Sequence, residues 1–424
     1  MKAAVLLIVS ATLALPQEEG DARARVRGVR ELSRGGEDAI AKITPYLRDV
    51  EISVRIEAVK GLVEIGGPKT LDGLLQAARD NDAEMQMRAT DGLVNIYLPG
   101  YIKTGISGSI QRAGTAIRAR FTDTNDQVID PYVQVRADVI EGLGRIAGGG
   151  SSFDSRANAA RAVGILRGRA AIPDLIDALR SKDSRLMYES LIALEKIGDP
   201  EAAPRMAFLL RDLDEKVQMA ALETTGVLRN KEAAPTVRDV LDRARSDKIR
   251  RSAAATLAMI GDLADHPRFI GLLADRDDAV RAAAAEGLGR MKNQVDRPVL
   301  ERTFAAERNT NARLSEAFAL ASLGSLDTGE LMPFRYLINT LNLKSYKGVA
   351  LAFLIELARD PRVRQVMYPM LARATKDERI GISNVLGRSG DKDSVTYLEA
   401  LSMDGDAEVA QQGIRDLRAL RARL

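Results

Sequence analysis

The stretch Val280–Met291, VRAAAAEGLGRM, decides the fold class. A small residue follows its arginine after three positions, and aliphatic residues follow after seven and ten, so all four lie on one face of an α-helix. The same pattern stands at residues 54–65, VRIEAVKGLVEI, and at residues 135–146, VRADVIEGLGRI. The chain therefore repeats one amphipathic helix.

This helical motif recurs along most of the chain at intervals close to 31 residues. Its arginine position is found at Arg55, Gln86, Arg136, Arg156, Met187, Gln218, Arg250, Arg281, Arg313, Lys347, Arg379 and, weakly, Ala410. A proline opens a shorter amphipathic stretch between motifs, at Pro173, Pro204, Pro235, Pro267 and Pro298. Proline suits the first turn of a helix because its missing N–H would have no partner there. We predict about twelve helix–turn–helix units, which bury their apolar faces only by stacking.

The motif D-x-x-V-R-x-x-A-x-x-x-L-G-x-(I/L) resembles HEAT repeats, in particular the bacterial subtype of the phycocyanobilin lyases, over residues 25–420. The resemblance implies an all-α, right-handed α-α superhelix that presents a surface to protein partners. It also implies a ladder of Asp–Arg contacts, here Asp277 or Asp278 with Arg281, and Asp247 with Arg250. Interruptions are expected at Met187, Gln218 and Ala410.

Composition excludes several kinds of chemistry. The chain has no Cys, so it has no thiolate nucleophile, Cys-ligated metal or disulfide, and its one histidine, His266, stands before Pro267 as an expected polar turn residue. The repeated His-Glu pairs of di-iron HEAT enzymes are absent. A net charge of +3 and the lack of Trp give no nucleic-acid signature. We therefore expect no catalytic residue, cofactor or metal.

Residues 1–20, MKAAVLLIVSATLALPQEEG, have the layout of a secretory signal peptide, with cleavage after Ala14. A buried N-terminal helix of a cytoplasmic protein is the alternative. No other apolar run approaches the length needed to span a bilayer, so the mature chain is expected to be exported without a transmembrane segment.

The spacing of about 31 residues is interrupted between Gln86 and Arg156, and residues 98–134 are predicted to form an irregular insertion. Tyr and Arg are favoured at binding hot spots, and this region gathers the candidate protein-binding residues Tyr97, Tyr101, Lys103, Arg112, Arg118, Arg120 and Tyr132, together with Phe121. The alternative is a degenerate repeat helix with its aromatic residues in the core. The stretch Gly148–Ser152, GGGSS, is interpreted as a link between an N-terminal block, 22–147, and a C-terminal block, 154–424.

The resemblance places the exposed positions of a concave face five residues after each motif start. Four acids stand there, Asp91, Glu141, Glu223 and Glu286, followed by an apolar stretch toward Phe318 and Ala352. This favours a mildly acidic inner surface; ordinary solvation of helices is the alternative.

We interpret the chain as an exported, non-catalytic scaffold or adaptor that binds a protein or peptide. Two alternatives stay open: an accessory lyase-like subunit that acts on a modified protein or pigment, and a binder of an anionic envelope polymer. The partner and the oligomeric state are left open by the sequence.

Overall fold

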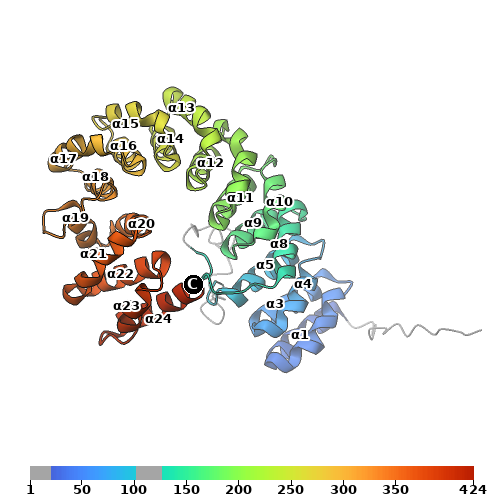
Figure 1. Cartoon of the computed structure of the whole chain (residues 1–424). Helices are drawn as coiled ribbons and strands as arrows, with labels where there is room; N and C mark the ends of the chain where they lie inside the picture. Colours follow the sequence, from blue (N-terminus) through green and yellow to red (C-terminus); the bar gives the residue numbers. More distant parts are fainter. Residues whose placement is uncertain (1–20, 102–126) are drawn as a thin grey trace, which may run out of the picture. The chain divides into compact units, whose positions relative to one another are not determined.

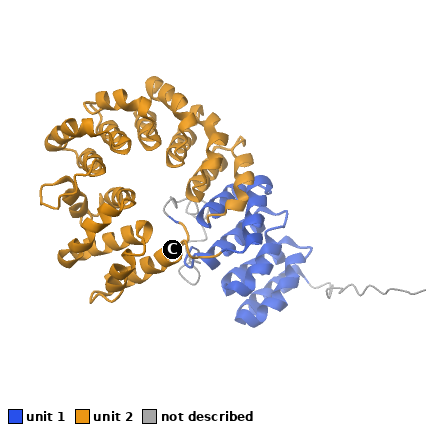
Figure 2. Cartoon of the chain, in the orientation of Figure 1, with its two compact units in different colours: residues 1–127, 135–166 blue, residues 128–134, 167–424 orange. Residues whose placement is uncertain are grey.

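The computed structural model describes residues 21–101 and 127–424. Within these ranges the regular structure is entirely helical, which confirms the all-α solenoid. The chain forms two compact units, residues 1–127 with 135–166 (unit 1) and residues 128–134 with 167–424 (unit 2; Figure 2). The predicted signal peptide lies outside the described residues, as do Lys103, Arg112, Arg118, Arg120 and Phe121 of the predicted insertion.

Unit 1 consists of seven α-helices in the described ranges. They are α1 (Ala22–Ser33), α2 (Ile40–Ile43), α3 (Ile52–Ile65), α4 (Leu71–Ala77), α5 (Ala83–Tyr97), α8 (Ala137–Gly149) and α9 (Phe153–Ile165). Helix α3 packs between α1 and α5, and α9 packs on both α5 and α8. Helix α9 belongs to unit 1 together with α5 and α8.

The GGGSS stretch itself is a short, ordered connection. Helix α8 ends at Gly149, and Ser152 forms a capping box with Ser155 at the start of α9. The backbone N–H of Ser151 donates to the side-chain oxygen of Gln86 over 2.9 Å. The division of the chain into blocks at this point stays a prediction.

Unit 2 contains two rows of helices (Figure 1). The motif helices are α11 (Ser184–Ile197), α12 (Glu215–Val227), α14 (Asp247–Ile260), α16 (Asp278–Met291), α18 (Thr310–Ser322), α20 (Lys347–Leu357), α22 (Lys376–Ser389) and α24 (Ala407–Arg421). Each packs on the next. The shorter elements are α10 (Ile172–Ala178), the 3-10 helix Pro200–Arg211, α13 (Ala234–Arg243), α15 (His266–Leu272), α17 (Arg297–Ala306), α19 (Pro333–Thr340), α21 (Pro361–Met370) and α23 (Ser394–Ser402). In Figure 1, α13, α15 and α17 lie outside the curve made by α12, α14, α16 and α18.

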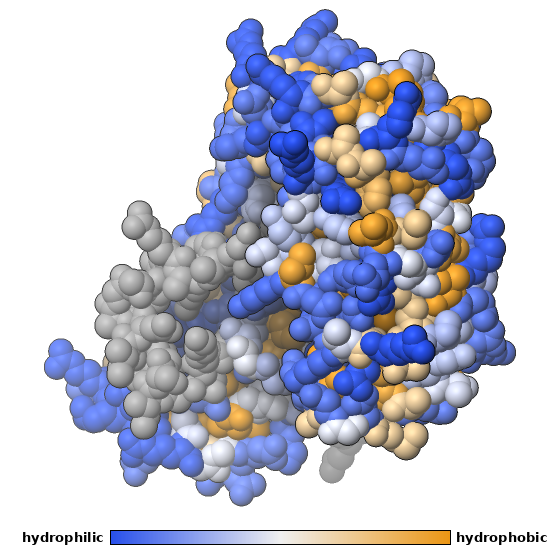
Figure 3. All heavy atoms as spheres, turned by 90° about the vertical axis from the view of Figure 1, so that its left-hand side faces the viewer, coloured by the Kyte–Doolittle hydropathy of each residue, from blue (hydrophilic) through white to orange (hydrophobic). Residues whose placement is uncertain are grey.

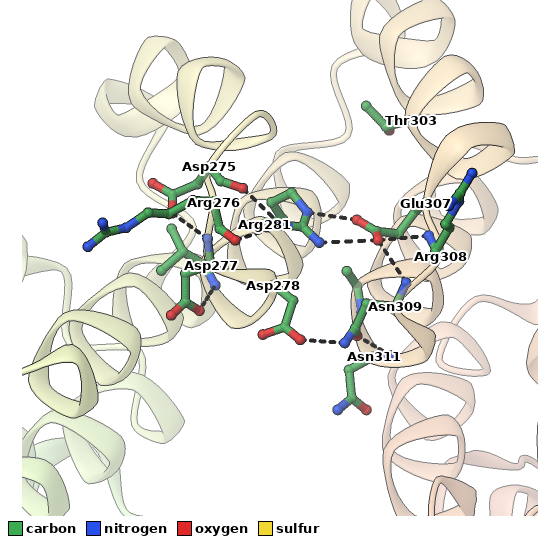
Figure 4. A network of polar contacts seen from close by, with 12 residues as sticks. Asp275, Arg276, Asp277, Asp278, Arg281, Thr303, Glu307, Arg308, Asn309 and Asn311 are labelled. Atoms are coloured by element: carbon green, nitrogen blue, oxygen red, sulfur yellow. Dashed lines mark hydrogen bonds and ion pairs between the residues drawn. The ribbon is translucent and has the colours of Figure 1, made fainter.

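A ladder of ion pairs joins the motif arginines to acids in later turns (Figure 4). Arg281 pairs with Glu307 at 2.7 Å, and its Nη1 also donates to the backbone oxygen of Asp275 at 2.9 Å. Equivalent pairs, at 2.5 to 2.8 Å, are Arg25 with Asp49, Arg55 with Asp80, Arg250 with Asp275, and Arg379 with Asp404. Each pair ties a motif helix to the turn that follows the next short helix.

The predicted local partners of this ladder are therefore wrong. Asp277 accepts the backbone N–H groups of Ala279 and Val280 as the N-cap of α16. Its other oxygen pairs with Arg251 of the preceding unit. The cap position holds the carboxylate away from Arg281. Gln218 occupies the position of a motif arginine, and its side-chain amide donates to the backbone oxygen of Leu210 at 2.8 Å. A hydrogen bond therefore replaces the ion pair in this repeat.

Five motif helices of unit 2, α11, α12, α14, α16 and α18, are each followed within two residues by a residue with positive φ. Gly198, Gly261 and Gly324 have φ of 71°, 66° and 91°. In the repeats that alternate with these, the equivalent residue is Arg229 or Lys292, with φ of 52° and 55°. Arg167, which follows α9, is the equivalent residue one repeat before Gly198 and has φ of 50°. Glycine adopts this conformation without strain, whereas a residue with a Cβ pays for it.

Candidate functional site

The predicted binding residues of unit 1 that lie within the described ranges differ in their contacts and exposure. Asp91 is half-buried and accepts a hydrogen bond from Asn158 Nδ2 at 2.9 Å, whereas Glu141 is exposed on α8. The hydroxyl of Tyr97 accepts from the backbone N–H of Arg136 at 3.2 Å. Tyr101 is half-buried just after α5.

The predicted residues of unit 2 occupy separate places. Tyr132 donates its hydroxyl to Asp130 at 2.8 Å. Glu223 is exposed on α12, and Glu286 is half-buried on α16. Phe318, expected in an apolar surface stretch, is 1% exposed and stacks on Phe353 with ring centroids 4.6 Å apart. The apolar surface expected at Phe318 is therefore wrong, because this ring fills the interface between α18 and α20.

A pocket of about 200 Å³ lies where four motif helices of unit 2 end. The C-terminal ends of α12, α16, α18 and α20 and the start of α21 form its walls. Five of its lining residues are cations, Arg229, Arg290, Lys292, Arg359 and Arg362, and two are acids, Glu356 and Asp360. None of these seven charged residues is among the binding residues predicted from the sequence.

Glu356 organises the pocket by holding two arginines. It accepts from Arg290 Nη2 at 2.9 Å and from Arg229 Nη2 at 2.9 Å. Arg290, only 11% exposed, also pairs with Glu286 at 3.0 Å and lies over the ring of Phe318, 5.1 Å from its centroid. Residues from α12, α16, α18 and α20 are thus joined through one buried guanidinium and one carboxylate.

The pKa values at this cluster reflect competition between burial and charge pairing. Burial alone would raise the pKa of Glu356, but its contacts with Arg290 and Arg229 outweigh burial and hold the pKa below its usual range. Burial alone would lower the pKa of Arg290, but Glu286 and Glu356 raise it. Both groups are therefore charged at neutral pH.

The pocket joins residues far apart in the sequence, and Arg229 and Glu356 are separated by 127 positions. A signal was nevertheless present. Arg290 and Glu356 both stand nine residues after a motif start, at Arg281 and Lys347, so opposite charges occupy one repeat position. Comparing the ninth position, in addition to the fifth, would have brought these two residues together.

The histidine has a structural place in a second ladder. His266 Nε2 lies 2.9 Å from Oδ1 of the buried Asp296, one unit further along. Arg297, at the same position before the next proline, donates to Ser325 and to the backbone oxygen of Leu323. His266 therefore links neighbouring short helices, as the arginine does in the next unit.

Two glutamates with raised pKa values predict a pH dependence of stability. Burial raises the pKa of Glu195 to about 7, with a contribution from the charge of Glu223, and burial raises the pKa of Glu316 to about 7. The ordinary value is 4.5, so between these values the folded chain keeps protons that the unfolded chain releases. The free energy of unfolding therefore falls as the pH rises through this window.

We expect the free energy of unfolding to be lower at about pH 8 than at about pH 5, by about 2 kcal/mol. The double variant Glu195→Gln, Glu316→Gln removes both titrations and should flatten the dependence. Urea unfolding followed by circular dichroism at both pH values measures it. An unchanged slope in the double variant would show that other groups carry the effect.

Exposed apolar side chains are scattered over the surface. On the face in Figure 3, hydrophobic patches alternate with hydrophilic side chains. No helix in residues 21–101 and 127–424 combines the length and the apolar character needed to cross a membrane.

Comparison with known proteins agrees with this architecture. The family model of HEAT repeats matches residues 10–94 and 140–212. The bilin biosynthesis protein PecE of Nostoc sp. (strain PCC 7120) is 29% identical over 152 residues, which is 35% of this chain and 59% of PecE. The match thus covers less than two thirds of that relative.

Two solved structures are similar at low scores. An engineered protein matches at a TM-score of 0.36 and 18% identity, over 94% of this chain and 99% of that chain. The complex of CpcE and CpcF of phycocyanin lyase from Nostoc sp. PCC7120 matches at a TM-score of 0.32 and 17% identity, over 77% of this chain and 97% of that chain. The chain is an all-α solenoid in which residues 10–94 and 140–212 match the family model of HEAT repeats, and part of its sequence is similar to a bilin biosynthesis protein.

Proposed function

We propose that this chain is a non-catalytic scaffold that binds another protein through the motif helices of unit 2. The observation that carries the proposal is the continuous row of motif helices, each packed on the next from α12 to α24. Repeat units contact mainly their neighbours, so a row of them presents an extended surface that is formed before binding. A preformed surface loses little conformational entropy on association.

The row carries both exposed acids and cations. Glu223 projects from α12 as an exposed side chain, and the cation-lined pocket lies at the ends of α12, α16, α18 and α20. Such charges steer a partner of complementary pattern and select its orientation. We further propose that the chain works after export, with residues 1–14 as its signal peptide, which the intact mass of the exported protein tests.

Chemical cross-linking followed by affinity purification of the full chain tests the scaffold. The variant Glu223→Lys alters the row, and Glu232→Lys, on an exposed turn before α13, is its matched control. We expect Glu223→Lys to weaken rebinding of the purified partner about tenfold and Glu232→Lys to leave it unchanged. If no purified protein rebinds the chain, or if both variants bind alike, the proposed surface is wrong.

A second candidate function is that of a lyase-related accessory subunit, favoured by the similarity to PecE. Incubation of the chain with a bilin and an apo-phycobiliprotein tests it by absorbance. A new absorption band and a mass increase in the acceptor protein, both dependent on the chain, would support this function over the scaffold.

A further inference from the structure

We propose that the pocket at the ends of α12, α16, α18 and α20 binds an acidic segment of a partner protein. This inference rests on the proposed scaffold function and names the chemistry of its partner. The occupant we infer carries carboxylate groups next to aliphatic side chains.

The backbone is the first observation. In the described ranges the non-glycine residues with positive φ are Arg167, Arg229 and Lys292, and each is a cation. Glycine occupies the equivalent position in the alternate copies, at Gly198, Gly261 and Gly324. A left-handed conformation costs a residue with a Cβ roughly 1 kcal/mol. Strain that is retained in this way marks positions where the side chain has a use, and Arg229 and Lys292 both line the pocket.

The charge balance of the pocket is the second observation. Its five cations face two carboxylates. Glu356 binds Arg290 and Arg229, and Asp360 binds Arg362 at 2.7 Å. Lys292 and Arg359 are exposed and have no hydrogen bond or ion pair through their side chains to any described residue. The pocket therefore has a positive surplus at its mouth.

The carboxylate of Glu356 shows how the arginines of this pocket bind an acidic group. Glu356 sits between two guanidinium groups, with 2.9 Å hydrogen bonds from Arg229 and from Arg290. A carboxylate from a partner would find Lys292 and Arg359 beside this cluster, and charge-assisted hydrogen bonds of this kind are the strong ones.

Size and apolar lining distinguish a protein segment from a free metabolite. The volume of about 200 Å³ is below that of pockets which enclose a small-molecule ligand, so it suits one anchoring side chain of a larger partner. Leu326, Leu357 and Val363 also line it. A segment with aliphatic and acidic side chains can use both the apolar wall and the cations.

The test is a fluorescence anisotropy titration of the full chain with a labelled peptide of glutamate and leucine. A peptide with glutamine in place of glutamate is the control ligand. We expect the double variant Lys292→Glu, Arg359→Glu to weaken binding of the glutamate peptide by at least about tenfold. The matched control Arg205→Glu, Lys392→Glu changes two exposed cations of unit 2 outside the pocket and should bind like the unaltered chain.

A further variant separates binding from folding. Lys292→Gly removes the cation and relieves the left-handed strain, so we expect a Tm equal to or above that of the unaltered chain together with weaker peptide binding. If binding survives in Lys292→Gly and in the double variant, the pocket is not the site. If polyphosphate binds through Lys292 more tightly than the peptide does, the occupant is an anionic polymer and the proposal is wrong.

Failure of the acidic-segment proposal can be distinguished from failure of the scaffold proposal by comparing the two sets of variants. A cross-linked partner that is lost with Glu223→Lys but retained by the pocket variants would leave the scaffold intact and overturn the acidic-segment proposal. A partner lost with the pocket variants, and competed by the glutamate peptide, would support both.

Discussion

Replacing Glu356 by alanine is expected to lower the free energy of unfolding by about 3 kcal/mol. The change leaves Arg290, which is 11% exposed, without the carboxylate that binds its Nε and Nη2. It also frees Arg229 and places two guanidinium groups together without a shared acid. Removal of one partner from a buried pair costs more than the pair contributes, because the remaining charge stays desolvated. Urea unfolding of the full chain measures the loss.

The control is Glu399→Ala, which removes the exposed acid that pairs with Arg421. Exposed pairs contribute little because water solvates both groups, and we expect a change below about 1 kcal/mol. The double variant Arg290→Met, Glu356→Leu removes both charges and should be more stable than Glu356→Ala. Equal losses in Glu356→Ala and Glu399→Ala would contradict a buried role for Glu356.

The repeat architecture could be predicted from the sequence because its cause is local. The motif at Arg281 and its copies fix one face of each helix, and such faces bury their apolar side chains only by stacking. The structure confirms this all-α solenoid. The spacing of three, seven and ten residues predicts which face of each helix is buried. The recurrence of the motif along the chain predicts the order in which the helices stack.

The side-chain partners could not be predicted in this way, because they depend on how far one unit reaches over the next. Arg281 pairs with Glu307, 26 residues away, and not with the neighbouring Asp277 or Asp278. Phe318 was expected at the surface because it stands five residues after a motif start, but Phe353 of α20 covers it. The Arg229–Glu356 contact needs the placement of α12 against α20, which no motif spacing contains.

Replacing Gly289 by valine is expected to lower the free energy of unfolding by about 3 kcal/mol. A Cβ atom at Gly289 would lie 2.7 Å from Cα of Ala319 and 3.1 Å from its Cβ. The first of these atoms belongs to the backbone of α18, so the clash is relieved only if α16 and α18 move apart. Well-packed interiors resist such movement, and overpacking forces strain into the neighbouring helices.

Gly271→Val is the matched control, because no atom lies within 4 Å of a Cβ built at Gly271. Gly271 also lies in a helix, α15, so both variants replace a helical glycine by the same residue. We expect the control to change the free energy of unfolding by less than about 0.5 kcal/mol. Gly289 lines the pocket beside Arg290, so separation of α16 from α18 should also weaken binding of the glutamate peptide. Urea unfolding and the anisotropy titration measure the two effects, and a Gly289→Val chain as stable as Gly271→Val would show that α18 yields to the added side chain.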